Sequence, residues 1–142
     1  MFRLAVIECV MLLVACALCR GQSSANCLSY EPTVVRLEGT LAKKTFPGPP
    51  NYESIRKGDK TETYWLLNLA IPVCVDEDQS EPTANSAQKN IRIVQLLLST
   101  EFYKTHAGLV GKHIIATGTL FGARTAHHHT PVLLTVSTLV EP

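Results

Sequence analysis

Hydrophobic and polar residues alternate with a period of two along most of the chain after residue 25. This period places successive side chains on opposite faces of an extended backbone, and it therefore predicts β-strands with one buried face. Strands are predicted at residues 34–41, 63–75, 91–98, 113–121 and 132–140. Because proline has no amide hydrogen to donate to a neighbouring strand, we expect the second of these strands to bend or bulge at Pro72.

One segment, residues 100–107, has the features of a helix. Ser99 or the residue after it can cap the amino end, and Gly108 can end the helix. Two turns are too few for intrinsic propensity to hold a helix in water. We therefore expect the helix to be stabilised by the packing of Phe102 and Tyr103 against the core.

The order strand, strand, strand, short helix, strand, strand is that of the OB-fold, a five-stranded Greek-key barrel. The sequence thus predicts an all-β domain with one short helix, an OB-fold-like Greek-key barrel that occupies residues 26–142. Ligands of such barrels commonly bind on strands two and three and on the loops that join strands one to two and four to five. Here those loops are residues 43–61 and 122–130.

Residues 1–25 have the composition of a signal peptide. Arg3 precedes an apolar run, interrupted by Glu8, and small residues favour cleavage after Ala25. The apolar run is shorter than the ~20 residues of a spanning helix, so no transmembrane span is expected in the mature chain. Residues 13–16 resemble a lipobox, which would instead anchor the chain through a lipid on Cys16. Both alternatives predict an exported protein, periplasmic or secreted.

Export leaves two cysteines in the mature chain, Cys27 and Cys74. In an oxidising compartment this pair predicts a single disulfide, and two buried free thiols are the alternative. The mature chain has eleven basic and eleven acidic residues. A neutral chain is a poor match for the phosphates of nucleic acid, so no nucleic-acid partner is expected.

Three consecutive histidines between the last two predicted strands are the main chemical signal. On an extended backbone His127 and His129 point to one side and His128 to the other. His127 and His129 could bind zinc or copper if His106, His113 or a loop carboxylate supplied a third ligand. Contact with a polar ligand and a purely structural role are the alternatives, and no other cofactor is expected.

The other loop is rich in proline and contains Tyr52 and Arg56. The prolines favour a rigid connector. Alternatively, Tyr52 and Phe46 could form an aromatic wall beside the histidines, with Arg56 close enough to bind an anionic group. Arg124, which precedes the histidines, is a further candidate for ligand contact. An acidic calcium site in residues 76–81 is not expected, because the ligand spacing of calcium loops is absent.

Three stretches carry a family resemblance: FPGPPNYESIRKGD at residues 46–59, IPVCV at 71–75 and GTLFGARTAHHHTPVLLTV at 118–136. They resemble a bacterial family of exported proteins known as domain of unknown function 4431, and the likeness extends over residues 30–139. The resemblance implies a protein of the bacterial envelope or exterior. It implies no activity and no catalytic residues.

The favoured function is a small non-enzymatic binding module that recognises an envelope protein, a peptide or a saccharide. Its candidate ligand-binding residues are Tyr52, Arg56, Arg124, His127, His128 and His129. A metal-binding protein that uses His127 and His129 is the alternative. An envelope hydrolase is less favoured, because the sequence has no nucleophile elbow, zinc-protease helix motif or phosphate-binding loop.

Overall fold

The computed structural model describes residues 26–142. The predicted signal peptide and the alternative lipidation at Cys16 lie outside the described residues. Five strands hold about half of the described chain: β1 (Val34–Pro47), β2 (Thr61–Val75), β3 (Gln88–Leu97), β4 (His113–Gly122) and β5 (Val132–Val140). The helices are short: α1 (Thr100–Thr105) and the 3-10 turns η1 (Ile55–Lys57) and η2 (Ala107–Leu109).

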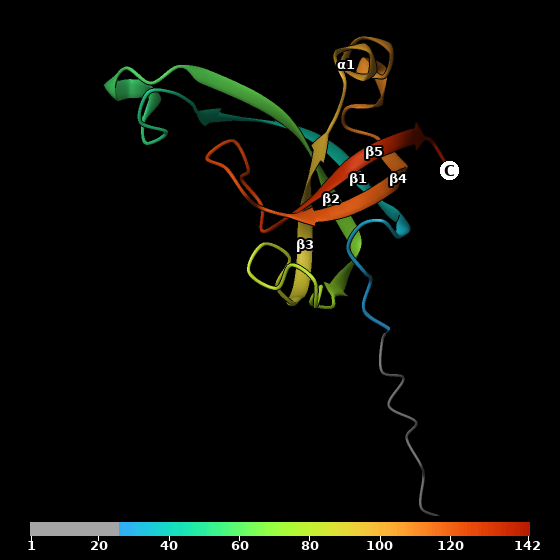
Figure 1. The fold of residues 1–142 in the computed structure, drawn as a ribbon. Helices are drawn as coiled ribbons and strands as arrows, with labels where there is room; N and C mark the ends of the chain where they lie inside the picture. The colour runs from blue at the N-terminus through green and yellow to red at the C-terminus, as the bar shows by residue number, and fades with distance from the viewer. Residues whose placement is uncertain (1–25) are drawn as a thin grey trace, which may run out of the picture.

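The strands form one closed barrel in the order β1-β2-β3-β5-β4 (Figure 1). Neighbouring strands are antiparallel, except that β3 and β5 run parallel and pair through Gln95 with Leu133, Leu96 with Leu134, and Leu97 with Thr135. The segment that contains α1 joins β3 to β4 at one end of the barrel (Figure 1). The prediction of a mainly β domain with five strands and one short α-helix is confirmed.

The interior of the barrel contains the side chains that the alternating pattern assigned to it. On β1 the alternate residues Val35, Leu37 and Leu41 are buried, together with Gly39, as a period of two over residues 34–41 predicts. A Cβ atom at Gly39 would lie 2.1 Å from the backbone oxygen of Asn68 on β2, so the close approach of these two strands requires glycine. The alternation on β1 therefore predicted the buried face correctly.

The second half of β2 departs from the predicted alternation. Its pairing with β3 shifts register between Asn68 and Val73, around Pro72, as the missing amide hydrogen of proline predicts. A strict period of two along residues 63–75 would place Ile71 on the same buried face as Trp65, and this is wrong, because Ile71 is 76% exposed. A bulge changes the face on which the following side chains lie, so a period of two cannot be continued through it.

The helix α1 is capped as predicted but ends earlier. The hydroxyl of Ser99 accepts a hydrogen bond from the Phe102 backbone N–H at 3.3 Å. The expected extension to residue 107 is wrong, because the helix ends at Thr105 and Gly108 lies inside η2. The ring of Tyr103 packs edge-on against buried Trp65, with ring centroids 5.1 Å apart, which confirms the predicted docking.

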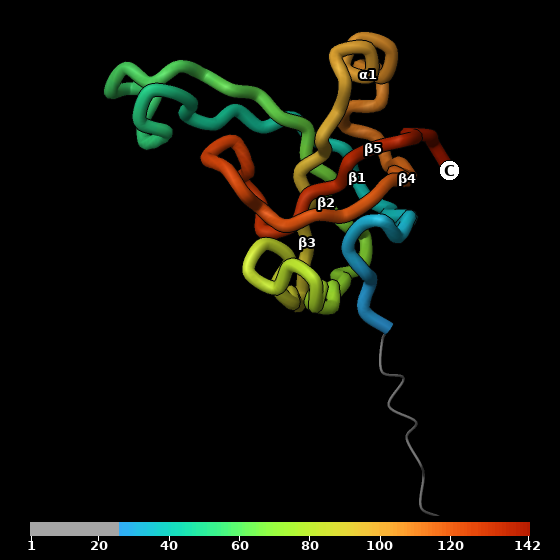
Figure 2. The backbone as a smooth tube through the Cα atoms, in the orientation of Figure 1, coloured from blue at the N-terminus to red at the C-terminus, as the bar shows by residue number. Residues whose placement is uncertain are grey.

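Strands β1 and β2 continue beyond the barrel as a projecting two-stranded arm. Pairing extends from Lys43 with Trp65 to Pro47 with Thr61, so the predicted loop of residues 43–61 is reduced to residues 48–60. We call residues 43–65 the β1–β2 arm. The tube representation shows the arm extending away from the barrel above the β4–β5 loop (Figure 2). This places the two loops of interest on the same side of the molecule.

The segment before β1 is tied to the end of β2. Cys27 and Cys74 form a disulfide, with Cα atoms 4.7 Å apart, which confirms the predicted pairing. Beside it the Leu28 N–H donates to the Cys74 carbonyl, and the Asp76 N–H donates to the Leu28 carbonyl. Among residues 26–142, none of the helices has the length and apolar character required to cross a membrane.

Candidate functional site

A buried glutamine holds the histidine loop in place. The Gln95 side chain, 1% exposed, donates through Nε2 to the His127 carbonyl at 3.0 Å and accepts through Oε1 from the His129 N–H at 2.7 Å. The Gln95 backbone N–H donates to the Thr130 hydroxyl at 3.0 Å. Because both ends of the amide are bonded to the loop backbone, the three histidines have defined directions.

His127 lies between the side chains of the β1–β2 arm. Its Nδ1 is 2.9 Å from Glu62 Oε2, and its Nε2 is 3.2 Å from the Tyr52 hydroxyl. The Tyr64 hydroxyl also donates to Glu62 Oε2, at 3.1 Å. Because a carboxylate accepts, the arrangement assigns the proton of a neutral imidazole to Nδ1 and leaves Nε2 to accept from Tyr52. His127 Nε2 is thus oriented to accept a hydrogen bond from a hydroxyl group.

The charges of this cluster are set by burial and by hydrogen bonds. Burial would raise the pKa of Glu62, but hydrogen bonds from His127 and Tyr64 and the nearby imidazoles leave that pKa below its usual value. Burial, followed by the bond to Glu62 and its charge, raises the pKa of Tyr64 to about 12. At neutral pH Glu62 is therefore an anion and Tyr64 is a proton donor.

His129 lies against the same arm by stacking. Its ring is parallel to that of Phe46, with an interplanar angle of 2° and centroids 3.8 Å apart. Lys44 places its Nζ 5.1 Å from the centroid of the Phe46 ring. Burial lowers the pKa of His129, and Lys44 and His127 add to the effect, whereas Glu62 opposes it. The buried Nε2 of His129 has no hydrogen-bond partner among the described residues.

His128 faces away from the arm, from a turn in which its backbone N–H donates to the Thr125 carbonyl. Its Nδ1 accepts a hydrogen bond from the Arg124 backbone N–H at 2.8 Å, and its ring packs edge-on against Phe121 at 5.5 Å. Burial lowers the pKa of His128, and the neighbouring imidazoles and Arg124 lower it further. This histidine closes its own loop and does not contact the arm residues that surround His127.

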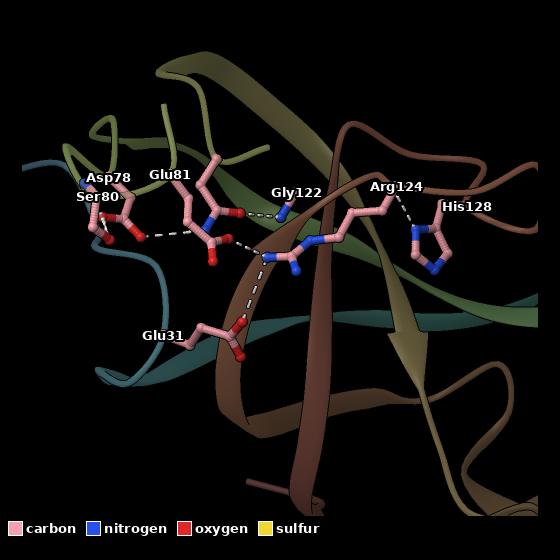
Figure 3. Close-up of polar contacts among 8 residues, drawn as sticks. Glu31, Asp78, Ser80, Glu81, Gly122, Arg124 and His128 are labelled. Atoms are coloured by element: carbon pink, nitrogen blue, oxygen red, sulfur yellow. Dashed lines mark hydrogen bonds and ion pairs between the residues drawn. The ribbon is translucent and has the colours of Figure 1, made fainter. Parts of the chain in front are cut away.

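The Arg124 side chain points toward the β2–β3 loop (Figure 3). Its guanidinium lies 3.0 Å from Glu81 and 3.7 Å from Glu31. Nearby, the buried side chain of Asn85 accepts from the Gly122 N–H. The ion pairs of Arg124 therefore connect the β4–β5 loop to the β2–β3 loop and to the segment before β1. They place this predicted ligand-binding residue away from Tyr52 and His127.

The turn at the end of the arm is shaped by one buried carboxylate. Asp59, 5% exposed, accepts hydrogen bonds from the backbone N–H groups of Asn51, Glu53 and Ser54 and from the Asn51 side chain, at 2.8 to 3.1 Å. The N–H groups of Ser54 and Glu53 contribute most to holding the pKa of Asp59 below its usual value. Tyr52 lies in this turn with a left-handed φ of 58°, which a non-glycine residue rarely adopts.

The predicted site residues thus divide into two groups. Tyr52, His127 and His129 lie together, in contact with Glu62, Tyr64 and Phe46. Arg56 is exposed in η1, beyond this cluster, and Arg124 and His128 face the other side of their loop. We call Tyr52, Glu62, Tyr64 and His127 the arm–loop cluster. Within residues 26–142, no three His, Cys, Asp or Glu side chains are grouped so that they could hold a metal ion.

Comparison with known families identifies the part of the chain that contains the histidine loop. Residues 93–139 match the Domain of unknown function (DUF4431). The match confirms, over this segment, the family resemblance of the sequence. No curated protein and no solved structure matches the chain. The DUF4431 segment contains Gln95 and all three loop histidines, whereas Tyr52 and Glu62 lie outside it.

Three contributors to the site were not expected from the sequence. Glu62 and Tyr64 alternate with residues of the opposite face in β2, so their sequence pattern is that of any solvated strand face. Gln95, in the DUF4431 segment, does carry a signal, because it is a polar residue inside the apolar run of β3. A buried polar side chain must find hydrogen-bond partners, and a loop backbone is a common source of them.

Proposed function

We propose that the protein is a small non-enzymatic binding module of the bacterial envelope or exterior, built on an OB-fold-like Greek-key barrel. The observation that carries this proposal is the position of His127, whose two ring nitrogens contact Glu62 and Tyr52 on the arm. Two segments far apart in sequence therefore share one continuous surface. Barrels of the OB type commonly bind ligands with these two loops.

The proposed ligand is a peptide, a protein segment or a saccharide that offers hydroxyl or amide groups. The His127 side chain is 47% exposed, and its Nε2 and the Tyr52 hydroxyl bond only weakly to one another, at 3.2 Å. A ligand hydroxyl can replace that bond on either partner, while Glu62 keeps the imidazole oriented. The Tyr52 ring adds an apolar surface of the kind that carries much of the energy at interfaces.

Arrays of glycans and peptides, followed by calorimetric titration of any ligand found, test the proposal. Tyr52→Ala and His127→Ala should each weaken binding at least about tenfold, a loss of about 1.4 kcal/mol. His113→Ala is the matched control, because His113 is a similarly exposed histidine bonded to a glutamate on another part of the barrel. A ligand whose affinity is unchanged by Tyr52→Ala and His127→Ala would refute this location of the site.

An extracytoplasmic location is part of the proposal. The Cys27–Cys74 disulfide supports it, because such bonds persist mainly in oxidising compartments. Mass spectrometry of the protein recovered from producing cells would determine its first residue. A chain that begins after Ala25 would support signal-peptide cleavage, a lipidated Cys16 would support the lipoprotein alternative, and an intact amino terminus in the cytoplasm would contradict both.

Zinc or copper binding by His127 and His129 is the alternative function for the same surface. One observation favours it: the buried Nε2 of His129 has no hydrogen-bond partner among residues 26–142. Equilibrium dialysis with zinc and with copper distinguishes the two functions. Stoichiometric binding that is lost in His127→Ala would replace the proposal above, and an absence of stoichiometric binding would eliminate the metal alternative.

A further inference from the structure

The β1–β2 arm concentrates positive charge on the surface of an otherwise neutral domain. Residues 26–142 contain equal numbers of basic and acidic residues. Five exposed cations nevertheless lie between positions 43 and 60: Lys43, Lys44, Arg56, Lys57 and Lys60. Among the described residues, this is the protruding segment in which basic side chains gather.

The carboxylates of the same segment do little to offset these cations at the surface. Asp59 is buried and its oxygens accept four hydrogen bonds from the turn. The Glu62 side chain is 17% exposed and is bonded to His127 and Tyr64. Glu53 is the one exposed carboxylate between positions 43 and 62. The arm therefore presents mainly positive charge to a partner.

Negative charge gathers at a different part of the barrel. The β2–β3 loop carries Asp76, Glu77, Asp78 and Glu81, and Glu31 lies close enough to that loop to share Arg124 with Glu81. Figure 1 shows this loop beneath the barrel, whereas the arm projects to the upper left of the view. A molecule with its charges separated in this way is oriented by an external charged surface even when its net charge is zero.

The turn of the arm also exposes an apolar side chain. Ile55 is 43% exposed and begins η1, where Arg56 and Lys57 follow it directly. An apolar residue flanked by cations is typical of segments that lie at a membrane interface, where the apolar group enters the acyl boundary and the cations contact anionic headgroups. A soluble polyanion would bind the cations but would gain no affinity from the exposed isoleucine.

We propose that the turn of the β1–β2 arm, with Ile55, Arg56 and Lys57 at its surface, binds an anionic lipid bilayer. The turn is already ordered by Asp59 and by backbone bonds from Gly48 to Lys60 and from Lys60 to Pro49. Little conformational entropy is therefore lost when it docks. This membrane contact is independent of the ligand proposed for the arm–loop cluster, and it would hold that cluster close to the bilayer surface.

Co-sedimentation with vesicles tests the proposal on the protein in its exported form, with the same mass-verified amino terminus in every variant. The parent should bind vesicles of equal parts phosphatidylglycerol and phosphatidylcholine more strongly than phosphatidylcholine alone. Raising salt from about 0.05 M to about 0.5 M should weaken this preference. The pair Arg56→Gln with Lys57→Gln should lower partitioning by roughly 25-fold, at about fivefold for each cation.

Ile55→Ser tests the apolar contribution, and it should lower partitioning by roughly fivefold at constant charge. Two matched controls should bind as the parent does. Ile71→Ser removes an isoleucine that is more exposed but lies on the barrel, and Lys89→Gln with Arg92→Gln removes two exposed cations of β3.

Three outcomes would overturn the proposal. The first is equal binding of the parent to anionic and neutral vesicles. The second is an equal loss in the arm variants and in the barrel controls. The third is binding of soluble heparin that matches vesicle binding and is unaffected by Ile55→Ser, which would identify a polyanion site instead. Titrations of any ligand of the arm–loop cluster should be unchanged in Ile55→Ser, so failure of one proposal leaves the other intact.

Discussion

Residues 26–142 contain two histidine–glutamate pairs of almost the same length in very different surroundings. His127 and Glu62 approach to 2.9 Å, with side-chain exposures of 47% and 17%. His113 and Glu38 approach to 2.7 Å, with exposures of 45% and 43%. The second pair joins neighbouring strands, since β1 and β4 are already paired by their backbones at these positions. The first joins the arm to the β4–β5 loop, and β2 does not pair with β4 or β5 in the barrel.

The difference shows that distance alone does not reveal what an ion pair does. The His113–Glu38 contact is a consequence of strand register, and both of its side chains are exposed. The His127–Glu62 contact is made between segments that no backbone ladder connects, and the hydroxyls of Tyr52 and Tyr64 complete it. The His113–Glu38 pair is thus a by-product of strand pairing, whereas the His127–Glu62 pair connects the arm to the β4–β5 loop.

The largest effect should come from a change that affects both pairs. Reduction of the Cys27–Cys74 disulfide frees a loop of 47 residues, and the chain-entropy model predicts a loss of about 4 kcal/mol of stability. Urea unfolding with and without reductant measures this loss. At a urea concentration between the transitions of the reduced and the oxidised protein, reduction should remove the native imidazole signals of His127 and His113 together. A reduced protein that unfolds at the same urea concentration would contradict the prediction.

Gln95→Leu should disturb the His127–Glu62 pair and leave the His113–Glu38 pair unchanged. The substitution leaves the His127 carbonyl and the His129 N–H, which are part-buried, without their partner, at a cost of about 2 kcal/mol. NMR should show a changed environment for the His127 ring and little change for the ring of His113. Gln79→Leu, at an exposed position, is the control for the loss of an amide. Equal perturbation of both histidine rings would mean that Gln95 supports the barrel in general.

Double-mutant cycles compare the two pairs directly. A cycle of Glu62→Gln and His127→Ala should give a coupling of about 1 kcal/mol in thermal or urea unfolding, because Glu62 is mostly shielded and accepts from two donors. The cycle of Glu38→Gln and His113→Ala should give no measurable coupling, because both partners are exposed. Equal couplings would remove the distinction between the pairs.

The smallest effect is a dependence on pH that belongs to the histidine loop. Burial lowers the pKa values of His128 and His129, so on acidification the unfolded chain takes up protons before the folded one. Stability should therefore fall as the pH drops below the unfolded histidine value of about 6.5, and Tm should decrease by about 3 °C between about pH 7.5 and pH 5.5. The lowered pKa of Glu62 adds a further loss only below about pH 4.3.

His129→Phe tests this origin, because phenylalanine keeps the stack on Phe46 but cannot titrate. Its Tm should fall less than that of the parent over the same pH range. Calorimetric scans at several pH values provide the measurement. A parallel decrease in the variant and the parent would assign the pH dependence to other groups.

The sequence pattern predicts the barrel well and the arm poorly, for one physical reason. Inside the barrel each strand has one face in the core, so hydrophobic residues alternate, and β5 was predicted at its observed bounds. Beyond Lys43 the two strands pair with each other without burying a core, and Lys44 and Pro47 there are typical of a loop. A pair of strands that covers no core leaves no alternating hydrophobic pattern in the sequence.

The site was predictable to the extent that it depends on local geometry. The opposite directions of His127 and His128 were predicted correctly, although the structure has a turn at residues 126–127 where an extended backbone was expected. The contact of His127 with Glu62 spans 65 positions, and no sequence spacing encodes it. Arg124 illustrates the same limit, because its partners Glu31 and Glu81 were visible in the sequence but their proximity was not.

The parallel seam between β3 and β5 has a consequence for motion. It is the shortest ladder of the barrel, with three residue pairs, and Gln95 occupies its first pair while its side chain holds the histidine loop. Transient opening of such a joint releases every group bonded to it at the same moment. The amide hydrogens of the seam and of His129 should consequently exchange with solvent as one unit, which makes the loop's mobility a measure of how often the barrel opens.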